Sequence, residues 1–288
     1  MKRESLENFY CNQVRQFRDT INQIQVSPAR EAIHKIRLNV KRMRTLKDVF
    51  CFIDSGRFFD EDLKSLTTIY KKIGEIREIQ VTKGLIRELI QDYSLQFDEL
   101  IIFLNDLEKE KTARLKSLNF QSNDFSELDS FFRKIQETLQ QISDQQLTSI
   151  LTNDFIQSRL NLFQGLTQEL ENEESWHTVR THIKRLFFLL EFLKKEPVNS
   201  LVIKNQRKLV RKIEAGLGRW HDRVIMLNLI GEFLKNEKYI HFADNCNLFL
   251  IQKVLCREKR LFLEQSVSLV EDLLNQYHTS ENINPYQD

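Results

Sequence analysis

The chain has 288 residues, of which 41% are hydrophobic and 29% charged, and its 43 Lys and Arg against 41 Asp and Glu give a formal net charge of +2. Only 7 Gly and 3 Pro are present, which argues against a turn-rich β architecture and favours a helical protein. The four Cys lack metal-ligand spacing, no secretory signal is visible, and no apolar run could span a bilayer. We therefore expect a cytoplasmic protein with reduced thiols.

Apolar residues recur at helical spacing along almost the whole chain, and no stretch alternates as a strand would. In the first half this spacing predicts helices at roughly 5–25, 28–53, 58–73, 75–92, 97–118 and 125–145. In the second half it predicts helices at roughly 147–171, 175–195, 199–216, 219–236 and 241–276. Ser27 and Pro28 should begin the second helix, Ser175 should cap the helix that starts at Trp176, and Pro197 should end it.

The helix predicted at 28–53 contains a basic segment that is repeated later in the chain. The sequence "HKIRLNVKRMRTLKDVF" at 34–50 aligns without gaps with "HTVRTHIKRLFFLLEFL" at 177–193, about 143 residues further on. A second pair, "IGEIREIQV" at 73–81 and "LGRWHDRVI" at 217–225, aligns at nearly the same offset and matches Gly74 with Gly218 and Glu78 with Asp222. The repeat predicts an internal duplication, with a first helical half at 1–145 and a second at 146–288.

The basic residues of the repeated segment form a row on one side of the helix. His34, Arg37, Lys41 and Arg44 fall within an arc of about 80°, next to the apolar arc that should face the core. His177, Arg180 and Lys184 repeat this arrangement, whereas Arg42 and Arg185 lie on another side. Residues 27–50 carry a net charge of +5 and residues 175–195 carry +4, so the rest of the chain sums to −7. Rows of cations beside a packing face should line a groove or cavity that binds an anion.

Arg and Lys favour phosphate as the anion, since Arg can donate two hydrogen bonds to it and Lys acts as a point charge. The chain contains neither a P-loop nor a G-x-G-x-x-G segment, so a nucleotide held by a glycine-rich loop is not expected. An extended polyanion that contacts many dispersed cations fits the pattern better.

The two basic segments, each followed by a Gly and an acidic residue, resemble the signature helices of the CHAD (conserved histidine α-helical domain) family. The resemblance spans roughly residues 5–276. It implies an all-α fold of two pseudo-symmetric antiparallel helical bundles that face each other across a basic groove. It also implies non-catalytic binding of inorganic polyphosphate in that groove, by His34, Arg37, Lys41, Arg44, His177, Arg180 and Lys184.

Further candidate ligands come from the same and other helices. Arg42 and Arg185 complete the matched pairs, and Arg114 and Lys259 lie in corresponding basic segments of the two halves, so we include all four in the polyphosphate-binding set. The chain also departs from the family pattern, with Phe187 in place of the first half's Arg44 and Glu78 in place of an Asp. It lacks the E-x-E-x-K pattern of the triphosphatase domains to which some relatives are fused.

Three other functions are weaker alternatives. The cations next to His34 and His177 would repel a divalent metal, and no catalytic grouping is evident, so we expect no metal, cofactor or enzymatic activity. Nucleic acid is a second candidate ligand with weaker binding, because the Phe residues follow the apolar stripe and do not alternate with cations as stacking platforms. A helical scaffold for an acidic protein partner is the third alternative. A polyphosphate binder could associate with polyphosphate granules.

Overall fold

The computed structural model describes residues 2–26, 28–58, 62–93, 97–118, 120, 125–166, 173–194, 201–240 and 245–281. These residues are predominantly helical and include no strand, which confirms the predicted all-α class. The elements are α1 (Arg3–Val26), α2 (Arg30–Ile53), α3 (Lys64–Tyr93), α4 (Asp98–Ser117), α5 (Ser126–Gln140), α6 (Asp144–Ser149), the π-helical turn η2 (Ile150–Asp154), α7 (Phe155–Leu166), α8 (Glu173–Leu193), α9 (Leu201–Leu234), α10 (Glu237–Ile240) and α11 (Asn245–Glu281).

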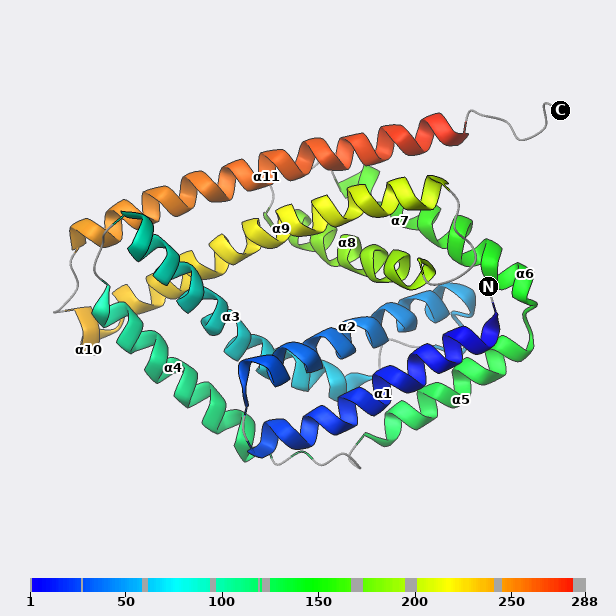
Figure 1. The fold of residues 1–288 in the computed structure, drawn as a ribbon, viewed down its shortest axis with the longest axis horizontal. Coiled ribbons are helices and arrows are strands. Elements are labelled where there is room, and N and C mark those ends of the chain that lie inside the picture. Colours follow the sequence, from blue (N-terminus) through cyan, green and yellow to red (C-terminus); the bar gives the residue numbers. More distant parts are fainter. Residues whose placement is uncertain are drawn as a thin grey trace.

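The helices form an elongated frame (Figure 1). The two longest, α9 and α11, pack side by side along one edge, and α1 packs on α2 and α5 along the other. Helices α2 and α8, which carry the two basic segments, contact each other in the middle of the molecule. Among the described residues, no helix combines the length and apolar character needed to cross a membrane.

Two apolar cores hold the frame together. The larger draws on residues from both predicted halves, including Ile36 of α2 and Ile183 of α8, which are fully buried. The smaller lies where α3 and α4 meet α9, α10 and α11, and includes the aromatic contact between Phe103 and Phe233, with ring centroids 5.6 Å apart. Along α3 and α9 the change from one core to the other falls near Glu78 and Asp222. The candidate site described below lies at this boundary.

The predicted interruptions at Gly74 and Gly218 are wrong. Helix α3 continues through Gly74 and α9 continues through Gly218, so four predicted helices become two. A single glycine weakens an exposed helix by only about 1 kcal/mol, and packing on both sides of these helices outweighs that penalty. The glycine at position 74 has a packing function that is described with the site.

Several predicted helix ends also differ from the structure. Helix α2 begins at Arg30 after Ala29, so Pro28 precedes the helix, and Ser27 lies outside the described residues. Helix α8 already begins at Glu173, which makes Ser175 an interior, buried residue and not a cap. Pro197 lies outside the described residues. These errors arise because capping residues are common along the chain, and only tertiary packing selects which one begins a helix.

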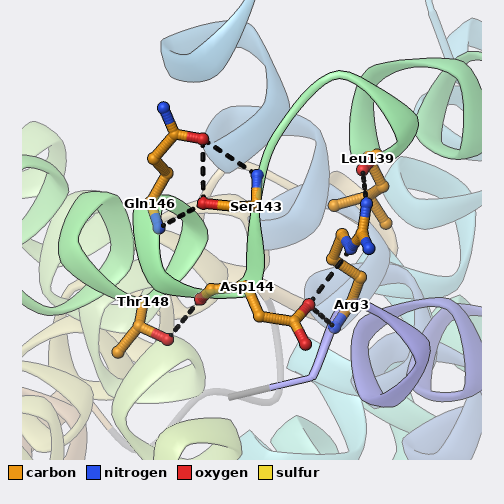
Figure 2. Close-up of polar contacts among 6 residues, drawn as sticks. All are labelled: Arg3, Leu139, Ser143, Asp144, Gln146 and Thr148. Atoms are coloured by element: carbon orange, nitrogen blue, oxygen red, sulfur yellow. Dashed lines mark hydrogen bonds and ion pairs between the residues drawn. The ribbon is translucent and has the colours of Figure 1, made fainter.

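One helix start has a complete cap that the sequence pattern missed. At the start of α6, Gln146 N donates to Ser143 Oγ at 3.2 Å, and Ser143 N donates to Gln146 Oε1 at 2.9 Å, which forms a capping box (Figure 2). The neighbouring Asp144 accepts hydrogen bonds from both the backbone nitrogen and Nε of Arg3, at 3.0 and 3.1 Å. The first turn of α6 is thereby fixed to the start of α1, and the helix predicted at 125–145 ends early, at Gln140.

Candidate functional site

Two adjoining cavities open among α2, α3, α8 and α9, and we call them cavity A and cavity B. Cavity A has a volume of about 250 Å³ and cavity B of about 310 Å³. Cavity A is lined by His34, Arg37, Leu38, Lys41, Arg77, Glu78, Val81, Thr82, Arg180, Lys184, Glu214, Gly218, His221, Asp222 and Ile225. Cavity B is lined by Arg37, Lys41, Arg44, Thr45, Tyr70, Glu78, His177, Arg180, Thr181, Lys184, Arg185, Phe188 and His221.

Four of the predicted cations line both cavities: Arg37 and Lys41 from α2, and Arg180 and Lys184 from α8. Each pair is separated by one helical turn, so both side chains leave their helix on the same side. The adjacent sides of the two helices are fully buried, as at Val40 and Val179. The cations therefore lie at the margin of the core, as the helical projection of the sequence predicts, and α2 and α8 bring the two rows together.

Arg37 is held against α3 by several contacts. Its Nη1 donates to the carbonyl oxygen of Tyr70 at 3.3 Å, and its guanidinium stacks on the Tyr70 ring at 4.4 Å. A Cβ atom at position 74 would lie only 2.6 Å from Arg37 Nη1. Gly74 therefore provides the space that the guanidinium occupies, which is a reason for glycine at this position even though the helix is continuous.

In the part of the chain that the structure describes, the four shared cations lack close acidic partners. Among the described residues, none of these four cations forms an ion pair within 4 Å, and Arg180 Nε is buried without a hydrogen-bond partner. The pKa of Lys41 is lowered to about 8, chiefly by burial and then by the charges of Arg37 and Arg180. Burial, followed by Arg180 and Lys41, also lowers the pKa of Lys184 well below its usual value. A polyanion in the cavities would relieve this repulsion.

Carboxylates partly neutralise cavity A. Glu78, Glu214 and Asp222 all line it, and only Glu78 also lines cavity B. Burial raises the pKa values of Glu78 and Asp222, although the neighbouring Arg side chains oppose this effect. The internal repeat matches Glu78 with Asp222, whereas Glu214 was not among the residues predicted from the sequence.

The histidines are distributed between the cavities. His34 lines cavity A, His177 lines cavity B, and His221 lines both. His177 contacts the rings of Trp220 and His221, with centroids 4.8 and 5.1 Å apart. Burial and then the nearby Arg180 lower the pKa of His221 to about 2, so this ring is neutral at physiological pH. Among the described residues, no group of three or more His, Cys, Asp or Glu side chains could hold a metal ion.

Two predicted ligands participate in contacts within the protein. Arg185 lines cavity B, but its Nε is 2.7 Å from Oδ2 of Asp48, which joins α8 to α2. Arg42 lines neither cavity, and its Nη1 donates to Gln13 Oε1 at 3.2 Å. His182, which also lies on α8, is partly buried, with Nδ1 3.2 Å from Arg159 Nη1.

Two further predicted ligands lie away from the site. Arg114 is exposed and pairs with Glu110 one helical turn earlier, at 2.7 Å. Lys259 pairs with Glu173 at the start of α8. Neither residue lines cavity A or B. Their corresponding positions in the two halves of the sequence were therefore not a guide to which residues line the cavities.

The cavities are also lined by residues that were not predicted from the sequence, among them Arg77, Tyr70, Thr181, Glu214 and Phe188. A signal for two of them was present: Tyr70 and Glu214 occupy the same position relative to Gly74 and Gly218. Phe187, which stands in place of the first half's Arg44, packs partly buried against the large core, and it is Phe188 that lines cavity B.

Fold and site together define an all-helical protein with two cation-lined cavities enclosed by four helices. Residues 9–231 match the CHAD domain family, so the chain belongs to this family, as the sequence resemblance indicated, although the match is shorter than the 5–276 expected. The fold is similar to the crystal structure of the CHAD domain from the plant Ricinus communis, with a TM-score of 0.71 and 15% sequence identity over 93% of this chain and 91% of that one. No curated protein sequence matches the chain significantly.

Proposed function

We propose that this chain binds inorganic polyphosphate, without catalysis, through the cations that line cavities A and B. The observation that carries the proposal is the set of four shared cations, Arg37, Lys41, Arg180 and Lys184, none of which has an acidic partner within 4 Å among the described residues. Placing such charges together is unfavourable unless an anion compensates them. A chain of phosphates would place one negative group after another along them.

The proposal includes the internal duplication and the basic groove that the sequence suggests. Cavity A is lined by His34, Arg37 and Lys41, and cavity B is lined by the matched residues His177, Arg180 and Lys184. This correspondence supports a common origin for the two halves. A polyanion would then run from one cavity to the other past the shared cations. Binding of this kind would allow association with polyphosphate granules in the cytoplasm, which microscopy of a tagged chain in polyphosphate-rich cells can test.

The test is a titration of the purified protein with long-chain polyphosphate at several salt concentrations. If about eight phosphates are neutralised, log K should fall with log salt with a slope of roughly −5 to −6, by analogy with single-stranded nucleic acids. Replacing all four shared cations with Gln should abolish binding. The matched control replaces four exposed cations of α9, Lys204, Lys208, Arg211 and Lys212, with Gln, which changes the net charge equally and should leave most of the binding intact.

Competition separates this proposal from its alternatives. Single-stranded RNA should displace polyphosphate only at much higher phosphate concentration, and polyphosphate chain length on a gel should be unchanged after incubation with the protein. A flat salt dependence, or equal loss of binding in the α9 control, would contradict capture by the cavity cations. Stronger binding of RNA than of polyphosphate would make nucleic acid the ligand.

A further inference from the structure

The two cavities share four cations but differ in the rest of their lining. Cavity A adds Arg77 together with two carboxylates, Glu214 and Asp222. Cavity B adds Arg44 and Arg185, and no further carboxylate. Cavity A thus presents five Lys and Arg against three carboxylates, whereas cavity B presents six against one. An equal division of ligand between the cavities is therefore not expected.

The carboxylates of cavity A oppose an incoming anion directly. The charges of Glu214 and Asp222 interact favourably with Arg180 and Lys184, so part of the field of these cations is already neutralised on the side of cavity A. A phosphate there would also approach the carboxylates themselves, and like charges at short range in a partly desolvated site repel strongly. In cavity B, the comparable neutralisation is the pairing of Arg185 with Asp48.

Cavity B also holds its donors in fixed positions. The Cζ atoms of Arg37 and Arg44 lie 4.4 and 5.5 Å from the centroid of the Tyr70 ring, so one aromatic side chain orients two guanidinium groups. Arg37 is fixed further by its hydrogen bond to the Tyr70 carbonyl oxygen. Phe188 adds apolar surface to the same cavity. Donors oriented before binding lose less conformational entropy when they bind phosphate.

We propose that cavity B is a subsite that binds a single triphosphate group on its own, and that cavity A contributes only when the anion is long enough to extend past the shared cations. This assignment rests on the proposed binding of phosphate polyanions. The triphosphate can belong to inorganic tripolyphosphate or to a nucleoside triphosphate, since the charged lining recognises the same group in both. Phe188 is the feature that could favour the nucleoside form.

The experiment is calorimetric titration with tripolyphosphate and with long-chain polyphosphate, in buffer without divalent metals. Two matched variants each remove one Arg that lines a single cavity: Arg44→Gln for cavity B and Arg77→Gln for cavity A. Arg44→Gln should weaken tripolyphosphate binding by about tenfold, as expected for the loss of a charge-assisted contact, and Arg77→Gln by less than about twofold. Both variants should weaken the binding of long-chain polyphosphate.

A third variant tests the role of the carboxylates. Glu214→Gln keeps the side-chain size and removes one negative charge from cavity A, so it should strengthen long-chain binding by a larger factor than tripolyphosphate binding. Circular dichroism of each variant establishes that the helices are intact. An effect of Arg77→Gln on tripolyphosphate equal to or larger than that of Arg44→Gln would overturn the assignment.

The outcomes separate this inference from the proposed function. If long-chain polyphosphate binds the unaltered protein but tripolyphosphate does not, the subsite is refuted and the proposed function stands. If tripolyphosphate binds in cavity B and the long chain binds no more tightly, the subsite stands and the polyphosphate proposal fails. Titration with ATP identifies the source of the triphosphate. If ATP binds more tightly than tripolyphosphate and Phe188→Ala removes the difference, the ligand is a nucleotide. If the two bind equally, the site recognises the triphosphate group alone. Either result supports the subsite.

Discussion

Gly74 illustrates how a single missing side chain shapes the site. The Arg37 guanidinium occupies the space next to the α3 backbone where a Cβ atom would lie 2.6 Å from Nη1. Sequence alignment selected Gly74 because it matches Gly218, but nothing lies within 4 Å of a Cβ at Gly218. The two glycines are therefore equivalent in sequence and different in packing.

We expect Gly74→Ala to displace Arg37 and to weaken polyphosphate binding by several-fold. The matched control is Gly84→Ala in the same helix, where a Cβ would meet nothing within 4 Å. Gly84→Ala should stabilise the protein by about 0.5–1 kcal/mol, as glycine replacement inside a helix usually does, without altering binding. Denaturant unfolding and a polyphosphate titration measure both effects. Identical behaviour of the two variants would contradict the role assigned to Gly74.

Lys41 should make stability and binding depend on pH. Because its pKa is lowered from 10.5 to about 8 in the folded protein, the unfolded chain binds more protons between these values, and the free energy of unfolding rises with pH there. The charged Lys41 side chain therefore lowers the free energy of unfolding by its full amount below about pH 8, and this destabilisation disappears towards pH 10.5.

An anion beside Lys41 should raise its pKa, so polyphosphate binding at about pH 8.5 should take up protons. Calorimetry in buffers of different ionisation enthalpy measures this uptake. Lys41→Gln should reduce it, and the control Lys71→Gln, at an exposed position outside both cavities, should not. Equal uptake in the Lys41 and Lys71 variants would contradict the prediction.

Among the helices, periodicity was a good guide to position and a poor guide to ends. Apolar spacing located every long helix because burial on one side imposes a 3.6-residue repeat. It failed at Gly74, at Gly218 and at Ser175, since glycines and capping residues occur inside helices as well as at their ends. The true cap at Ser143 depends on a Gln three residues later, which is a local signal that a search for capping boxes would have found.

Ser143→Ala should therefore lower the free energy of unfolding by about 1 kcal/mol, because it leaves the Gln146 backbone N–H without its acceptor. Ser126→Ala provides the control: Ser126 is exposed at the start of α5, which has no side-chain cap. It should change stability by less than about 0.5 kcal/mol. Urea unfolding of both variants measures the difference, and equal values would show that the capping box contributes little.

Across the whole molecule, the contact between Arg185 and Asp48 joins the two basic helices. Their side chains are only 22% and 16% exposed, and the atoms that pair lie 2.7 Å apart. Burial raises the pKa of Asp48 despite this partner, so the ion pair does not fully offset the desolvation of the carboxylate. The pair serves to fix α8 on α2, which aligns the cations of both helices.

Arg185→Leu should lower the free energy of unfolding by about 1–3 kcal/mol, because it leaves Asp48 partly buried without its closest cation. Arg114→Leu breaks an exposed pair with Glu110 and should change stability by less than about 1 kcal/mol. A double-mutant cycle with Asp48→Asn isolates the pair itself. If Arg185→Leu lowers the free energy of unfolding no more than Arg114→Leu does, the contact between Arg185 and Asp48 is not a structural link.

The amino-acid sequence alone was enough to predict the helical class, the resemblance to the family and the pairing of cations along α2 and along α8. The helical class and the cation pairs follow from local spacing, since side chains one helical turn apart share a side of the helix wherever that helix packs. The tertiary structure decided which cations remain without acidic partners: it pairs Arg185 with Asp48, places Arg114 and Lys259 away from the site, and brings Arg77 and Glu214 into cavity A. Those assignments depend on how α3 and α9 approach α2 and α8, and no spacing within a single helix contains that information.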